Sequence, residues 1–162
     1  RLTGVLRLIW MVEHMFLGRF YHSIDDKGRL MVPARFRAYL TPDGVYVMQG
    51  FERNLMVFPA RTFEAVSQKI QSMTFTEPTA RLLRRLIYST ANHVEIDRVG
   101  RFLIPQFLRD AANLDVGVIV VGNGDYFEIW SPEAWDEQDR ELRDVQSNAT
   151  RFADLMISTS VS

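Results

Sequence analysis

Two Asp–Arg pairs of identical spacing are the residues in this sequence best suited to binding chemistry. Asp25 and Arg29 stand in "IDDKGRLMVP", and Asp97 and Arg101 stand in "IDRVGRFLIP". A guanidinium can bind a phosphate or a base edge through two parallel N–H donors, and a neighbouring carboxylate can orient it for that contact. The same pair can instead be a structural ion pair, which contributes little where it is exposed. The motif alone leaves both interpretations open.

A glycine in each motif predicts a tight hairpin loop between the aspartate and the arginine. A three-residue hairpin loop is commonly a type I turn closed by a residue in the left-handed region, which glycine occupies without steric cost. Gly28 and Gly100 fit that position, so "DKG" and "RVG" are expected to be hairpin tips. We expect the strands flanking each tip to pair with each other, with Asp and Arg as cross-strand neighbours.

A proline ends the second strand of each predicted hairpin. Pro33 and Pro105 suit the first turn of a helix, where the missing N–H costs nothing. Phe36 and Leu108 then lie on the apolar faces of short helices. The apolar runs "VYVMQ" and "VIVVG" follow, each with a turn and a further strand. Each half of the chain is therefore predicted to be a hairpin, a short helix and a second hairpin.

The two halves form an internal repeat at an offset of 72 positions. The match continues as a pattern between "GVYVMQGFERNLMVFPARTF" and "GVIVVGNGDYFEIWSPEAW". Around the motifs, identical residues are Ile24, Asp25, Gly28, Arg29, Pro33 and Arg37, which align with Ile96, Asp97, Gly100, Arg101, Pro105 and Arg109.

Longer helices are predicted outside the hairpins. "PARTFEAVSQKIQSM" and "SPEAWDEQDRELRDV" indicate outer helices, the second with Ser131 as N-cap, and a linking helix runs through "ARLLRRLIYS". We divide the chain into a first repeat with its outer helix (15–74) and a linking helix with the second repeat and its outer helix (75–146). A loose polar tail is expected at 147–162.

Residues 1–14 precede the first clear strand pattern. Their apolar stretch is short and has no small-residue cleavage site after it, which argues against a signal peptide. We interpret them as an upstream extension, disordered or artefactual, with an amphipathic partner-binding segment as the alternative. Met15 is our choice for the true start.

Composition excludes several classes of protein. The 162 residues are 47% apolar and include no cysteine, which rules out disulfides and thiolate metal sites and fits the cytoplasm. No apolar run approaches the roughly 20 residues that cross a bilayer. The three histidines show no metal-ligand spacing or nucleophile partner, so we expect no catalysis, metal, cofactor or small-molecule substrate.

The charges are segregated along a chain whose net charge is only −1. Residues 15–38 hold five basic and two acidic side chains, whereas residues 133–144 hold two basic and six acidic ones. A tip bearing Lys27 and Arg29 can approach phosphate or a base edge, because a two-stranded ribbon fits the major groove. The second tip has Arg98, but Val99 takes the place of lysine, which makes it the weaker electrostatic candidate.

A third basic group lies in the linking helix. Arg81, Arg84 and Arg85 are interleaved with leucines. We interpret this segment as a core stripe with a solvated or inter-subunit face, and DNA contact as the minor alternative.

The doubled DxxxR motif, its downstream plan and the opening "MFLGRFYHSIDDKGRL" resemble the MraZ family of tandem SpoVT-AbrB regulators. The resemblance implies an α+β fold in which AbrB-like repeats form a swapped-hairpin (double-split) β-barrel with peripheral helices. It further implies a cytoplasmic, nucleoid-associated ring-shaped homo-oligomer that binds double-stranded promoter repeats, usually as a repressor of the division and cell-wall gene cluster. The DNA-binding candidates are Arg29, Lys27, Arg101, Arg19 and Arg98. The structural motif residues are Asp25, Gly28, Pro33, Asp97, Gly100 and Pro105.

The sequence is also compatible with a second class of function. The acidic helix and the N-terminal segment would suit an oligomeric protein-interaction scaffold without specific DNA binding. Binding to promoter repeats that weakens steeply with salt distinguishes the regulator from the scaffold.

Overall fold

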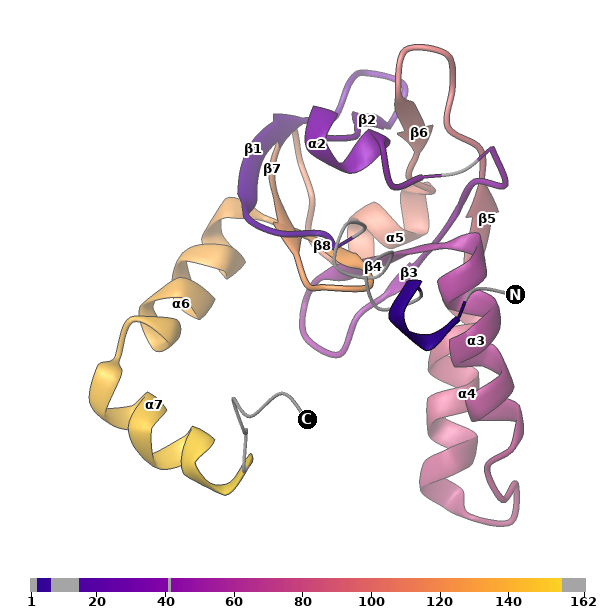
Figure 1. Ribbon diagram of the computed structural model, residues 1–162. Helices are drawn as coiled ribbons and strands as arrows, with labels where there is room; N and C mark the ends of the chain where they lie inside the picture. The colour runs from indigo at the N-terminus through magenta and orange to yellow at the C-terminus, as the bar shows by residue number, and fades with distance from the viewer. Residues whose placement is uncertain (1–2, 7–14, 41, 156–162) are drawn as a thin grey trace.

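Strands from the two repeats are interleaved within one sheet of an α+β fold (Figure 1). The computed structural model describes residues 3–6, 15–40 and 42–155. The strands are β1 (Arg19–Ser23), β2 (Arg29–Met31), β3 (Val45–Gln49), β4 (Leu55–Pro59), β5 (Asn92–Val94), β6 (Arg101–Leu103), β7 (Gly117–Gly122) and β8 (Phe127–Trp130). The helices are α2 (Ala34–Arg37), α3 (Ala60–Gln71), α4 (Pro78–Thr90), α5 (Gln106–Ala111), α6 (Pro132–Leu142) and α7 (Val145–Phe152).

The β3–β4 and β7–β8 hairpins are confirmed, but the strands flanking the two tips pair differently from the prediction. β1 pairs antiparallel with β7, and β2 pairs with β6, so both join the other repeat. Within the first motif, the predicted strand pairing is reduced to one isolated β-bridge between Ile24 and Leu30. Burial explains the exchange: Leu30 lies opposite Phe102 in the β2–β6 ribbon, and both side chains are buried.

The described strands form an open sheet and a separate ribbon. The sheet order is β1-β7-β8-β4-β3-β5, and the ribbon is β2-β6. The hydrogen-bonded pairs among these strands therefore do not close the predicted barrel. The repeats are nonetheless interleaved, since neighbours β1 and β7, and β4 and β8, come from different halves.

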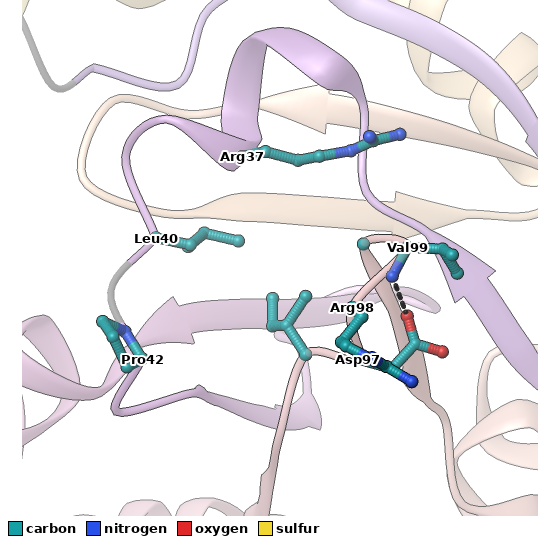
Figure 2. Close-up of a pocket in the computed structure, with 8 residues that line it drawn as sticks. Arg37, Leu40, Pro42, Asp97, Arg98 and Val99 are labelled. Carbon is teal, nitrogen blue, oxygen red and sulfur yellow. Dashed lines mark hydrogen bonds between the residues drawn. The ribbon is translucent and has the colours of Figure 1, made fainter.

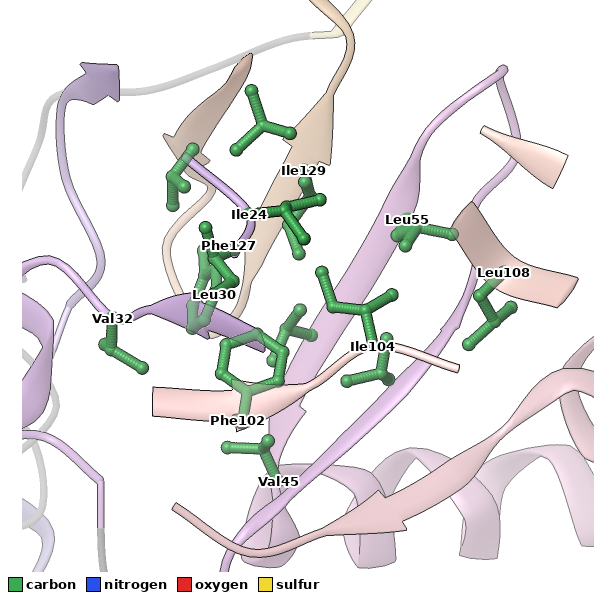
Figure 3. Packing of buried hydrophobic residues seen from close by; sticks show 14 of the residues in the cluster. Ile24, Leu30, Val32, Val45, Leu55, Phe102, Ile104, Leu108, Phe127 and Ile129 are labelled. Carbon is green, nitrogen blue, oxygen red and sulfur yellow. The ribbon is translucent and has the colours of Figure 1, made fainter. Parts of the chain in front are cut away.

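The main core lies between the sheet and the ribbon. Figure 3 shows Leu30 and Phe102 from the ribbon facing Phe127 and Ile129 of β8. Phe16, ahead of β1, stacks edge-on against Phe36 of α2 at 5.0 Å between ring centroids. Because both repeats contribute buried side chains to this core, neither repeat has a complete core of its own.

The two prolines sit one position earlier than predicted. Pro33 is the N-cap residue of α2, with φ −51° and ψ 137°, and its carbonyl accepts from the Phe36 N–H at 2.8 Å. Pro105 caps α5 in the same way, with φ −54° and ψ 146°. Proline's fixed φ is compatible with this extended conformation, so each proline ends its strand and leaves its carbonyl for the helix.

The outer helices lie on opposite sides of the molecule in Figure 1. The α3–α4 pair covers a second apolar cluster that includes Phe63, Ile70 and Ile87. The α6 helix begins as predicted, because Ser131 Oγ accepts from the Ala134 N–H at 3.2 Å. No helix in the described part of the chain is long and apolar enough to span a membrane.

Part of the expected loose tail is regular structure. α7 is followed by a 3-10 turn at Ala153–Leu155. Asp144 caps α7 by accepting from the backbone N–H of Ser147 at 3.2 Å and from its hydroxyl at 2.7 Å, and these bonds lower the pKa of Asp144. Residues 156–162 lie outside the described residues, as does the expected extension apart from the exposed residues 3–6.

Candidate nucleic-acid interface

The first tip is held by the carboxylate of Asp25. Its Oδ1 accepts from the backbone N–H groups of Lys27 at 3.0 Å and Arg29 at 2.9 Å, and its Oδ2 accepts from Arg29 Nε at 2.9 Å. The backbone N–H of Asp25 donates to the Arg29 carbonyl at 2.9 Å. Gly28 closes the turn with φ +84°. One carboxylate thus fixes both the loop backbone and the plane of the arginine.

The second tip repeats this geometry almost atom for atom. Asp97 Oδ1 accepts from the N–H groups of Val99 at 3.1 Å and Arg101 at 2.8 Å, and Oδ2 accepts from Arg101 Nε at 2.9 Å. Gly100 has φ +92°. The predicted Asp–Arg neighbours are therefore present in both copies, although the strands beyond them separate.

The same hydrogen bonds lower the pKa values of the two aspartate carboxyl groups. Hydrogen bonding from the Arg29 backbone N–H is the main cause that lowers the pKa of Asp25, with the side chain of Arg29 adding to it. The Arg101 backbone N–H does the same for the pKa of Asp97. Both aspartates therefore stay ionised at neutral pH and hold their arginines as charged partners.

The ribbon joins the two tips, which enter it from opposite ends. Arg29 pairs with Leu103 in the β2–β6 register, and Arg101 pairs with Met31. An Arg101 Nη1 atom lies 3.9 Å from Asp25 Oδ2, so that carboxylate faces arginines from both repeats. The two guanidinium groups therefore lie on the same face of the ribbon, each beside its aspartate, rather than at two separate sites.

Each loop is also braced by an arginine from the other repeat. Arg109 of the second repeat lies against Gly28, and Arg37 of the first lies against Gly100. Their Nε atoms donate to the carbonyls of Ile104 at 3.0 Å and Val32 at 3.1 Å. The two arginines occupy equivalent positions in the internal repeat, but no role was predicted for them. Their identity in both copies was the signal that could have found them.

Backbone bonds complete this reciprocal arrangement. The Ile104 N–H donates to the Gly28 carbonyl at 2.9 Å, and the Val32 N–H donates to the Gly100 carbonyl at 2.8 Å. The loops are thus anchored at their glycine ends. The exposed residues at their apices, Lys27 in the first and Arg98 in the second, face solvent.

The apex of the second loop differs in chemistry from the first. Val99, which replaces the lysine, is 52% exposed. A cavity of about 300 Å³ lies beside this loop, and Figure 2 shows Arg37 extending from α2 towards it while Asp97 accepts the Val99 N–H. Leu40, Pro42 and Ile96 supply its apolar lining. The second tip therefore offers one cationic and one apolar side chain at its apex.

Arg19 is the predicted DNA-binding residue that the structure does not bring to the tips. It begins β1, at the end away from the first loop. Its Nη1 pairs with Asp139 of α6 at 2.8 Å, and its guanidinium carbon lies 5.0 Å from the ring centroid of Trp135. These contacts tie β1 to α6.

The fold and this face define a tandem-repeat protein whose halves jointly present paired Asp–Arg hairpin tips. A family model described as "MraZ protein, putative antitoxin-like" matches residues 15–86 and again 87–155. The chain belongs to the MraZ family.

Curated relatives named "Transcriptional regulator MraZ" support the assignment. The protein of Thermomicrobium roseum is 45% identical over 88% of this chain and 100% of its own. That of Roseiflexus castenholzii is 42% identical over 86% and 94%, and that of Moorella thermoacetica 44% over 80% and 90%. Among solved structures, "The solution structure of PHS018 from pyrococcus horikoshii" is similar at a TM-score of 0.31 and 13% identity, over 70% of this chain and 87% of that one.

Proposed function

We propose that this protein is a sequence-specific DNA-binding transcriptional regulator that contacts DNA through its two hairpin tips. The observation that carries the proposal is the pairing of Arg29 and Arg101 on one face, each preset by its own aspartate. The relatives named as transcriptional regulators support the same class of function. Cytoplasmic, nucleoid-associated localisation follows from that role.

The geometry suggests how the arginines act. In each tip Nε is bonded to the aspartate, which leaves the terminal nitrogens to donate to a base edge or a phosphate. Lys27 and Arg98, exposed at the loop apices, supply phosphate contacts. Arg29 and Lys27 make the first tip the stronger contributor.

A single chain offers few phosphate contacts, so affinity has to come from several chains together. We infer that the chains assemble into a ring with AbrB-like interlocked halves and that the ring spans repeated promoter sites. By analogy with the family it resembles, the protein represses the division and cell-wall gene cluster.

The test is a binding titration on the DNA upstream of the protein's own gene. Arg29→Ala should weaken binding to the repeats by about fivefold or more, since one good bidentate contact is worth roughly 1–3 kcal/mol. Arg53→Ala removes an exposed positive charge from the β3–β4 loop and is the matched control. Unchanged specific affinity in a folded, normally assembled Arg29→Ala variant would contradict the proposed role of Arg29.

The alternative function is a protein-interaction scaffold. The observation in its favour is α7, which buries none of its residues within the chain. A wild-type protein that shows no preference for the promoter repeats over scrambled DNA, at any salt concentration, would favour the scaffold.

A further inference from the structure

The cavity beside the second loop lies between the two repeats. Leu40 and Pro42, which follow α2 of the first repeat, form one side of it, and residues 97–99 of the second repeat form the other (Figure 2). Its volume of about 300 Å³ is at the small end of the range for ligand sites. Leu40 and Ile96 are only half-buried, although both pack against the main core. Apolar surface is therefore left uncovered where the two repeats meet.

The equivalent position beside the first loop is closed. At the internal offset of 72, Leu40 corresponds to Ala112 and Ile96 corresponds to Ile24. Both counterparts are buried, Ala112 completely and Ile24 with only 6% of its surface exposed. The Ile24 N–H also donates to the Val116 carbonyl at 2.7 Å, which holds this strand end against the chain that precedes β7. The opening beside the second loop is thus a departure from the repeat rather than a consequence of it.

Two arginines give the cavity a positive lining. Arg37 extends from α2, Arg98 stands at the apex of the second loop, and both are exposed. Asp97 also lines the cavity, but its Oδ1 accepts from the Val99 N–H at 3.1 Å and its Oδ2 accepts from Arg101 Nε at 2.9 Å. Arg101 balances the charge of Asp97, so the two lining guanidinium groups leave a surplus of positive charge beside an apolar wall.

We propose that this cavity binds a small organic anion, a carboxylate or phosphate monoester with a compact apolar body, and is an effector site beside the second tip. The guanidinium groups of Arg37 and Arg98 donate to the anionic group of the ligand. The apolar body of the ligand covers Leu40, Pro42 and Ile96. A ligand of this kind uses both parts of the lining, since small-molecule sites combine apolar walls with a few polar groups that fix orientation.

A bound anion acts on the second tip through Arg98. In the proposed function Arg98 supplies a phosphate contact, and a guanidinium held by the ligand is not available to DNA. The ligand should therefore weaken promoter binding and lower the slope of log affinity against log salt by about one per contacting tip. This effect on DNA rests on the proposed function, whereas binding of the anion in the cavity does not.

Methyl NMR spectra of the full chain without DNA test the site directly. Phenylacetate and phenyl phosphate are the anionic probes, benzyl alcohol is the control without charge, and acetate is the control without an apolar body. We expect saturable shifts of the Leu40, Ile96 and Val99 methyl groups with at least one anionic probe, and no comparable shift of Ile24 beside the first loop. Benzyl alcohol should bind more weakly by about tenfold or more, since a hydrogen bond to a charged group is worth at least that factor. The probe that binds more tightly shows whether a carboxylate or a phosphate is preferred.

Two variants address the two parts of the lining separately. Arg98→Glu reverses the charge at the loop apex and should abolish the shifts caused by the anionic probes. Leu40→Trp fills the apolar side of the cavity and should do the same with both arginines in place. Arg35→Ala removes an exposed arginine of α2 that does not line the cavity, so this control should bind the probes like wild type. Circular dichroism identifies any loss of fold, and Arg98→Glu keeps the test decisive if Leu40→Trp does not fold.

Three results would overturn the inference: no shift of these methyl groups with either anionic probe, binding of benzyl alcohol or acetate as tight as that of the anions, or unchanged binding by Arg98→Glu. Promoter titrations with and without the tighter anion then measure the effect on DNA. Anion binding that leaves promoter affinity and its salt slope unchanged would overturn the effector role. A wild type without any promoter preference in the absence of probe is a failure of the proposed function instead, and the NMR result stands apart from it.

Discussion

The guanidinium of Arg109 lies directly against Gly28, so a Cβ atom at position 28 would stand 2.8 Å from Cζ of Arg109. The first loop is thus in contact, at Gly28, with Arg109 of helix α5 in the second repeat. Two effects therefore fix glycine at this position: the left-handed backbone and the space taken by an arginine half the length of the chain away.

Gly28→Ala is expected to lower the free energy of unfolding by more than the backbone strain alone. A non-glycine residue in the left-handed region costs about 1–2 kcal/mol, and the displacement of Arg109 adds to it. Gly124→Ala is the matched control, since Gly124 has φ +80° and nothing within 4 Å of a Cβ. Urea unfolding of the two variants checks this, and equal losses would show that Arg109 yields freely.

Asp25→Asn should destabilise the protein at neutral pH by removing the charge that holds Arg29. The pKa of Asp25 is lower in the folded chain than the ordinary 3.8. The stabilisation is therefore complete above that value and is lost as the pH falls through the lower folded-state pKa. The gap in unfolding free energy between wild type and variant should shrink over that acidic range. Asp26→Asn, an exposed neighbour in the same loop, should show a smaller gap at neutral pH.

Substituting the residues at the loop apices should change the salt dependence of DNA binding without changing the fold. Lys27→Ala is expected to reduce the slope of log affinity against log salt by about one per contacting tip, and Val99→Lys to increase it by a similar amount. Titrations of promoter DNA at several salt concentrations measure both. A Val99→Lys variant with an unchanged slope would show that the second tip stays away from phosphate.

Substitutions of buried residues in the β2–β6 ribbon should strongly lower the free energy of unfolding, because the ribbon joins the repeats. Leu30 is fully buried opposite Phe102, so Leu30→Ala should cost about 2–5 kcal/mol. Leu103→Ala, in the facing strand but 49% exposed, should cost far less. Thermal unfolding distinguishes them, and comparable losses would contradict the ribbon's place in the core.

The tips were predictable because their chemistry is local. An aspartate, a glycine three residues later and an arginine one further define the loop and its ion pair within five positions, as found for Asp25 and Arg29. The outer helix α6 could be predicted for the same reason, because its N-cap residue Ser131 directly precedes the proline of its first turn.

The partners of the flanking strands were not predictable from turn chemistry. A loop fixes its own closure, but which strand lies beside β1 or β2 depends on burial shared with residues far along the chain, such as Leu30 with Phe102. The family resemblance pointed to interlocked halves where local patterning pointed to separate hairpins. α7 was missed because its apolar residues are few, although the Asp144 and Ser147 pair was a capping signal.

Because each loop is braced by residues of the other repeat, the first loop can be anchored only late in synthesis. The first loop emerges from the ribosome early, yet the groups that anchor it, the Ile104 N–H and the Arg109 guanidinium, are translated only after α3, α4 and β5. Since chains lengthen at roughly 5–20 residues per second, the first tip spends several seconds of each translation without its native supports. The first loop therefore reaches its anchored conformation only when the second repeat has been synthesised through Arg109.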